Sequence, residues 1–362
     1  MLSSSASKRA SKTFLRTLQP SFKKTTRRSL SNNEGKKGKL ILVRHGQSIW
    51  NVNDRDLDLV SRFTGWTDIE LTSRGRSQAL AAGSSLTSEK ITVAYVSLLK
   101  RALSTLEIMA SKMNLLSSSQ RYKIPVTETW RLNERHYGSL CGMSKLEAED
   151  IFSVEDLSRW RNGWDTAPPK MDAVTLGRWR KATHCKPYTH HIKAHSSHRT
   201  TTSDSSSTYS PEFHSFSEPG LLRSKEISKI NTGNWQRAMK AEMPASESLK
   251  DTVERVRPLW EGGLKCQLLE GENVLVVAHA NIIRSLLYHF DPHVNSETLK
   301  AVKIPSAQPL ICRFENVGGE LINIGEVCGR TKLKAEWVES EEIEKYSFCT
   351  LVGESALEHE IA

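Results

Sequence analysis

One stretch organises this chain: Leu40-Ile41-Leu42-Val43-Arg44-His45-Gly46-Gln47-Ser48-Ile49-Trp50-Asn51. Its short, partly β-branched apolar run predicts a buried strand. Arg44 and His45 follow at once, and Gly46 permits a tight turn. In an open α/β sheet, ligands bind beyond the carboxyl ends of the strands, so both side chains are expected in such a crevice. An imidazole beside a guanidinium suits phosphoryl transfer. A surface turn that happens to contain histidine stays open as an alternative on these residues alone.

Two further apolar runs predict strands that lead to a cationic or imidazole side chain. Thr92–Val96 is followed by Arg101, and Glu272–Ala278 by His279. Because the carboxyl ends of parallel strands share one edge of a sheet, Arg101 and His279 are expected to face His45. A solvated arginine at a helix start and a core histidine are the alternatives, but three such groups at three strand ends favour a site.

Segments between and after these strands have the apolar spacing of helices. We expect helices at about 73–86, 102–113, 248–260 and 281–290, with the third ending near Gly262-Gly263, and a last strand at about 310–314. Alternation of strands and helices indicates an α/β fold.

The net charge of +10 is concentrated at the N-terminus. Residues 1–39 hold eleven Lys or Arg and one acid, so the remaining chain is neutral. The Ser/Thr/Arg-rich, nearly acid-free composition of residues 1–38 predicts a mitochondrial transit peptide, with a plastid or cytoplasmic location as alternatives. A disordered basic arm that binds nucleic acid or anionic lipid is the other interpretation. Since the rest is neutral, we expect no nucleic-acid partner, and the lack of a long apolar run predicts no membrane span.

Composition also marks an insertion at about 172–234. It contains Thr200–Thr208, a Ser/Thr-rich run, and half of the chain's twelve histidines. Such a segment buries little, which predicts a flexible insertion. A metal site with Cys185 is the alternative, but the spacing matches no standard zinc finger. The six cysteines show no pairing pattern, as is typical of free thiols.

Several blocks of this sequence resemble, in order, those of cofactor-dependent phosphoglycerate mutases in the histidine phosphatase superfamily. They are the opening stretch, Arg62-Phe63-Thr64-Gly65-Trp66-Thr67-Asp68, Arg131-Leu132-Asn133-Glu134-Arg135-His136-Tyr137-Gly138 and Ala278-His279-Ala280-Asn281. The similarity runs from about Lys39 to Phe314, with an interruption at about 171–235. It implies a three-layer α/β/α sandwich with a mostly parallel sheet, here a catalytic domain at 39–329 followed by a tail at 330–362.

The resemblance also implies a reaction and a site. The reaction would interconvert 3-phosphoglycerate and 2-phosphoglycerate in glycolysis and gluconeogenesis, through a phosphohistidine at His45 that 2,3-bisphosphoglycerate primes, without a metal. The partner would be a small-molecule phosphoglycerate, and the chain a possible homodimer. The implied catalytic residues are His45, Glu134, His279, Arg44 and Arg101. The implied substrate-binding residues are Ser48, Asn51, Thr64, Gly65, Tyr137, Lys145, Arg161, Asn162 and Asn281.

Two positions depart from the family pattern. Relatives carry two adjacent arginines where this chain has Arg161 and Asn162, and usually glycine where it has Ala280. A neutral amide in place of a guanidinium weakens binding of a far phosphate or carboxylate. Two rival functions therefore stay open: a histidine phosphatase acting on a small phosphorylated metabolite or phosphoprotein, and a non-enzymatic interaction protein.

Overall fold

The computed structural model describes residues 33–52, 61–171, 244–325, 334–341 and 343. Most of the predicted leader and the whole predicted insertion, with its histidines, lie outside these ranges. Among the described residues, no helix has the length and apolar character needed to cross a membrane.

A single mixed sheet forms the middle of the molecule. Its strands run in the order β3-β2-β4-β1-β5-β6, and the short β7 also pairs with β5. Neighbouring strands from β3 to β1 are parallel, whereas β5, β6 and β7 pair antiparallel. The predicted fold class is thereby confirmed. The strands are β1 (Lys37–Arg44), β2 (Val93–Ser97), β3 (Val126–Thr129), β4 (Asn273–Ala278), β5 (Leu310–Val317), β6 (Glu320–Asn323) and β7 (Glu336–Trp337).

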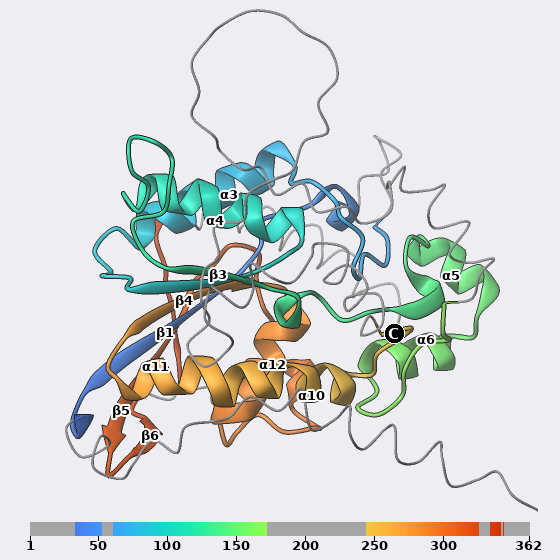
Figure 1. Ribbon diagram of the computed structural model, residues 1–362. Coiled ribbons are helices and arrows are strands. Elements are labelled where there is room, and N and C mark those ends of the chain that lie inside the picture. The colour runs from blue at the N-terminus through green and yellow to red at the C-terminus, as the bar shows by residue number, and fades with distance from the viewer. Residues whose placement is uncertain (1–32, 53–60, 172–243, 326–333, 342, 344–362) are drawn as a thin grey trace, which may run out of the picture.

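Helices cover both faces of this sheet (Figure 1). On one face lie α3 (Ser73–Ser85) and α4 (Lys100–Lys112), and on the other α10 (Leu249–Leu259), α11 (Lys265–Leu269) and α12 (Ala280–Phe290). Successive side chains of a strand point to opposite faces, so the continuous apolar run of β1 serves two cores. Leu40 and Leu42 belong to the cluster with α10 and α12, and Ile41 and Val43 to the cluster with α3 and α4.

Two short helices, α5 (Lys145–Ile151) and α6 (Val154–Asn162), lie to one side of the sheet (Figure 1). They share a small apolar cluster with Phe63 and Leu140. Ser144 and Glu147 form a capping box at the start of α5, which satisfies backbone N–H groups at the helix terminus. Short 3₁₀ turns complete the described elements: η2 (Ile49–Asn51), η3 (Trp130–Leu132), η4 (Gly138–Leu140) and η6 (Leu299–Ala301).

The predicted end of the 248–260 helix near Gly262-Gly263 is wrong. The chain continues from α10 through a π-helical turn, η5 (Trp260–Leu264), directly into α11. Trp260 is buried against Phe290 and Phe314, and Leu264 and Leu268 are fully buried in the same core. Fully burying a large apolar side chain contributes about 1.5–3 kcal/mol, more than the roughly 1 kcal/mol by which a glycine disfavours a helix interior.

Candidate active site

The turn after β1 lies against the start of α3. The backbone N–H of His45 donates to the Ala278 carbonyl at 3.0 Å. The pairing of β1 with β4 therefore extends one residue beyond the end of β1. A Cβ on Gly46 would lie 2.2 Å from the Gly75 carbonyl oxygen, and one on Gly75 would lie 2.0 Å from that of Gln47. No side chain fits such an approach, so glycine at both positions holds His45 at the carboxyl end of β1.

The tautomer of His45 follows from its neighbours. Its Nδ1 lies 2.7 Å from the Gly46 carbonyl oxygen, which only accepts, so Nδ1 carries the hydrogen. Nε2 then holds the lone pair of the neutral ring, and the Nε–H of Arg101 donates to it at 3.3 Å. Burial, then Arg101 and Arg44, lower the pKa of His45 well below its ordinary value, against the opposing effect of the Gly46 carbonyl. The ring is therefore neutral near pH 7, with Nε2 as the potential nucleophile.

Arg101 brings a fixed positive charge to this nitrogen. It lies in the first turn of α4 and is only 1% exposed. Its Nη1 and Nη2 donate to the carbonyls of Thr67 and Gly65 at 2.8 and 2.9 Å, so the predicted block at 62–68 orients the guanidinium. Gly65 has φ +50°, where glycine carries no steric penalty. Arg44 donates through Nη1 to the Ile304 carbonyl at 2.8 Å.

His279 completes the cluster from the end of β4. Its ring centroid lies 5.0 Å from that of His45, and the planes meet at 59°. The side chain is fully buried, and its Nε2 lies 2.8 Å from the Ser97 hydroxyl. Burial, followed by Arg101, His45, Arg44 and Arg255, lowers the pKa of His279 well below its ordinary value.

A second group of predicted residues meets beside the start of α12. Asn281 donates through Nδ2 to the Tyr137 hydroxyl at 3.1 Å. Glu134 accepts the backbone N–H of Arg135 at 2.8 Å through Oε1. Arg284, which the sequence reasoning missed, donates to Asn281 Oδ1 at 3.1 Å and thus fixes the orientation of that amide. Burial lowers the pKa of Arg284, while the charge of Glu134 and then Tyr137 oppose this.

A buried ion pair that the sequence reasoning also missed supports the segment carrying Glu134. Arg255 contacts Glu247 through Nε–Oε1 at 2.6 Å and Nη2–Oε2 at 3.0 Å. The same guanidinium donates to the carbonyls of Trp130, Arg131, Asn133 and Glu134. The burial of Arg255 could have been predicted from helical spacing, because this residue shares a helical face with Thr252 and Leu259, on the apolar side of the predicted helix.

The other predicted residues lie at the margin of this buried group. Ser48 is buried and donates to Asn51, which is exposed, at 2.5 Å, and Thr64 is half-buried with its hydroxyl 3.3 Å from the Arg62 carbonyl. The predicted far-phosphate residues are exposed, on α5 and α6: Lys145, Arg161 and Asn162.

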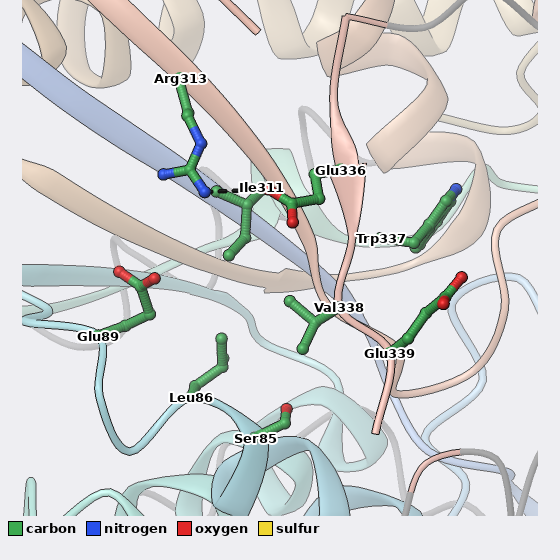
Figure 2. Close-up of a pocket in the computed structure, with 9 residues that line it drawn as sticks. All are labelled: Ser85, Leu86, Glu89, Ile311, Arg313, Glu336, Trp337, Val338 and Glu339. Carbon is green, nitrogen blue, oxygen red and sulfur yellow. Dashed lines mark hydrogen bonds and ion pairs between the residues drawn. The ribbon is translucent and has the colours of Figure 1, made fainter. Parts of the chain in front are cut away.

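A hollow of about 330 Å³ lies elsewhere, between the end of α3 and strands β5 and β7 (Figure 2). The ion pair of Arg313 with Glu336, at 2.9 Å, crosses its wall. Arg313 pairs with Lys39, near the beginning of β1, whereas His45 follows the end of that strand. None of the predicted site residues lines this hollow, so we place the site by the strand ends. Within the described ranges, no group of three or more potential metal ligands gathers.

A neutral buried imidazole that contacts one guanidinium, feels the charge of a second and lies beside another imidazole is an arrangement for phosphoryl transfer through histidine. The chain belongs to the histidine phosphatase superfamily (branch 1), whose sequence pattern matches residues 40–183 and 221–326.

Two curated relatives within this superfamily have the same enzyme name. The 2,3-bisphosphoglycerate-dependent phosphoglycerate mutase of Corynebacterium jeikeium is 31% identical over 298 residues, which cover 82% of this chain and 91% of the relative. The enzyme of that name from Staphylococcus saprophyticus is 32% identical over 275 residues, or 75% and 92% of the two chains. Among solved structures, a Bacillus anthracis phosphoglycerate mutase matches with TM-score 0.45 and 16% identity over 88% and 98% of the chains. A mycobacterial glucosyl-3-phosphoglycerate phosphatase matches with TM-score 0.45 and 18% identity over 80% and 96%.

Proposed function

We propose that this protein interconverts 3-phosphoglycerate and 2-phosphoglycerate through a phosphohistidine at His45. One observation carries the proposal: the lone pair of a neutral, buried His45 Nε2 lies beside the Arg101 guanidinium and the His279 ring. Two curated relatives with the mutase name, each aligned over three quarters or more of this chain, support the choice of substrate.

The proposed cycle begins with phosphorylation of His45 by 2,3-bisphosphoglycerate, in which a P–O bond breaks as the P–Nε2 bond forms. The 2-hydroxyl of 3-phosphoglycerate then attacks phosphorus, its proton passes to the Glu134 carboxylate, and the P–Nε2 bond breaks. The resulting bisphosphate reorients and returns its other phosphoryl group to His45 as the bond between phosphorus and the 3-oxygen breaks. Glu134 gives its proton to that oxygen, leaving 2-phosphoglycerate. Arg44, Arg101 and His279 stabilise the charge on the transferring group, which is the main demand of phosphoryl transfer.

Binding would be divided among the remaining predicted residues. Ser48 and Asn51 hold the phosphoryl group from the turn after β1, and Thr64 and the Gly65 N–H receive the substrate. Tyr137 and Asn281 line the other side. Lys145, Arg161 and Asn162 serve the end of the substrate farthest from His45. We also propose that the chain forms a homodimer and that it is located in mitochondria.

The test is a product assay on the full chain. The protein is mixed with 3-phosphoglycerate, with and without a catalytic amount of 2,3-bisphosphoglycerate, and 2-phosphoglycerate and free phosphate are both followed by ³¹P NMR. A mutase yields 2-phosphoglycerate in excess over phosphate and is stimulated by the bisphosphate. Release of phosphate without 2-phosphoglycerate overturns the proposal in favour of a phosphatase.

The phosphatase alternative rests on Asn162. This residue is exposed at the end of α6. It supplies no positive charge where the resemblance leads us to expect a second arginine. Weaker binding of the monophosphate would leave the phosphohistidine open to attack by water, and weaker retention of the bisphosphate would let this intermediate escape from the unphosphorylated enzyme.

A further inference from the structure

Three fully buried polar side chains, those of Asn133, Ser97 and His279, are connected by hydrogen bonds that end at Nε2 of the His279 ring. Ser97 ends β2, Asn133 follows η3, and His279 follows β4, the strand that pairs with β2. Each of the three is 0% exposed. The proposed cycle uses neither the Ser97 hydroxyl nor the Asn133 amide.

The direction of each hydrogen bond can be deduced from one backbone group. The N–H of Leu98 lies 3.1 Å from a side-chain atom of Asn133, and because this N–H can only donate, that atom is the amide oxygen Oδ1. The oxygen cannot donate, so the Ser97 hydroxyl, 2.9 Å away, must donate to it. The backbone N–H of Leu99 also donates to Ser97 Oγ, at 3.2 Å.

Ser97 Oγ has thereby used its single hydrogen and can only accept from His279. Since His279 Nε2 lies 2.8 Å from this oxygen, Nε2 must carry a hydrogen. The other ring nitrogen, Nδ1, is buried, and no described residue forms a hydrogen bond to it. A buried nitrogen without a protein partner on the side of the ring away from Ser97 is a group kept for a ligand or a reacting atom.

We propose that Ser97 and Asn133 are positioning residues that hold His279 in the Nε2–H tautomer, so that Nδ1 is the nitrogen presented to the phosphoryl group. The inference rests on the proposed phosphohistidine chemistry for its purpose, but the tautomer itself does not depend on which substrate is used. In the resting enzyme Nδ1 has a lone pair. When a phosphoryl group on His45 adds negative charge, Nδ1 takes up a proton from solvent and donates to a phosphoryl oxygen.

The charges around the ring agree with this sequence of events. Arg101 from α4, Arg44 and His45 from the end of β1, and Arg255 from α10 all disfavour protonation of His279 in the resting state. An arriving phosphoryl group offsets these positive charges, which raises the pKa of the ring. A fixed tautomer then ensures that the added proton has only one place to bind.

The test measures the tautomer directly in the full chain without substrate. Protein labelled with ¹⁵N-histidine is studied by NMR at about pH 8, and the His279 signals are assigned by difference with His279→Gln. Two-bond couplings to the ring hydrogens identify which nitrogen is protonated. The wild type should show protonated Nε2 and unprotonated Nδ1. An Nδ1–H tautomer in the wild type overturns the proposal, whatever the outcome of the product assay.

Three variants extend the measurement. Ser97→Ala removes the acceptor, so the two tautomers should exchange, and kcat should fall by about 10- to 100-fold with little change in KM, the range expected for one buried hydrogen bond. Asn133→Leu frees the Ser97 hydroxyl to donate to Nε2 and should enrich the Nδ1–H form. Thr252→Val removes a different fully buried hydroxyl, from α10, and should leave the tautomer and kcat unchanged. An unaltered Nε2–H tautomer in both Ser97→Ala and Asn133→Leu would refute the assigned roles.

Discussion

At the scale of single residues, the central question is which histidine takes the phosphoryl group. His45 and His279 are both buried and neutral near pH 7, but only in His45 does the described structure place a guanidinium N–H directly on the nitrogen with the lone pair. That contact places Arg101 beside His45 Nε2, where the guanidinium can pass its N–H from the lone pair to the oxygens of an arriving phosphoryl group and stabilise their charge.

His45→Gln should abolish both turnover and acid-labile labelling of the protein by ³²P-2,3-bisphosphoglycerate, since no ring nitrogen remains to attack phosphorus. His289→Gln is the control, because His289 is half-buried and donates to the Val253 carbonyl in a different part of the core. It should keep both properties. Normal labelling of His45→Gln would exclude His45 as the nucleophile.

Asn162→Arg adds a positive charge at the end of α6, where the family resemblance leads us to expect a second arginine. A second guanidinium beside Arg161 should strengthen retention of the bisphosphate, because charge-assisted hydrogen bonds are roughly twice as strong as neutral ones. We expect a lower ratio of released phosphate to 2-phosphoglycerate and a lower concentration of 2,3-bisphosphoglycerate for full activity. Asn162→Gln is the neutral control. If neither quantity changes in the arginine variant, Asn162 has no part in retention.

At the scale of elements, the pair of Arg255 and Glu247 joins α10 to the segment that carries Glu134. Glu247 Oε2 also accepts the backbone N–H of His136 at 2.8 Å, so the carboxylate contacts the segment directly as well as through Arg255. Both side chains of the pair are nearly inaccessible, at 6% and 3% exposed. Removing one partner of such a pair leaves an uncompensated buried charge.

Glu247→Gln should therefore lower the free energy of unfolding by about 3 kcal/mol, measured by urea denaturation. Glu254→Gln is a matched control, since it breaks the 2.6 Å ion pair with Arg257 on the same helix, where both side chains are half exposed. Its cost should stay within about 1 kcal/mol. The double variant Glu247→Gln/Arg255→Met should lose less than the two single changes added together. Equal losses in the buried and exposed variants would show that the buried pair does not stabilise this connection.

At the scale of the whole molecule, the buried histidines predict sensitivity to acid. Burial and then Arg101 lower the pKa of His45; burial lowers that of His136 from 6.5 to about 4, with Glu247 opposing; and burial lowers that of His279. The unfolded chain binds protons at these histidines below about pH 6.5, whereas the folded chain does not until lower pH. The free energy of unfolding should therefore fall as pH drops below 6.5.

Each such histidine contributes a slope of up to about 1.4 kcal/mol per pH unit. Asp68 and Glu128, whose pKa values burial raises, bind protons in the folded state and offset part of this slope nearer pH 4. Urea denaturation from pH 7.5 to 4.5 measures the effect. His136→Gln should reduce the slope by up to about 1.4 kcal/mol per pH unit, the contribution of one histidine. An unchanged slope in that variant would contradict a lowered pKa for His136.

The leader gives a prediction that concerns the full chain. A fluorescent reporter fused to residues 1–38 should enter mitochondria, because this segment is basic, Ser/Thr-rich and nearly free of acids. A chain that begins at Lys36 should keep its activity, since β1 begins at Lys37. A reporter in which the basic residues of this segment are replaced by Gln is the control. Cytosolic retention of the unaltered fusion would refute targeting.

The sequence by itself predicted the strands β1, β2, β4 and β5, and that Arg101 and His279 would face His45 beside Arg44. The reason is local: a short apolar run specifies a strand, and the carboxyl ends of parallel strands share one edge wherever their order places them. The partners that orient those groups were decided by tertiary structure. Ser97 meets Asn133 and His279 across 36 and 182 residues, and Arg255 reaches Asn133 across 122. No periodicity within one segment encodes such contacts, because they exist only once distant elements pack together. The helical conformation at Gly262-Gly263 was likewise decided by tertiary structure. Burial of Trp260, Leu264 and Leu268 in the core stabilises it against the helix-breaking tendency of the two glycines.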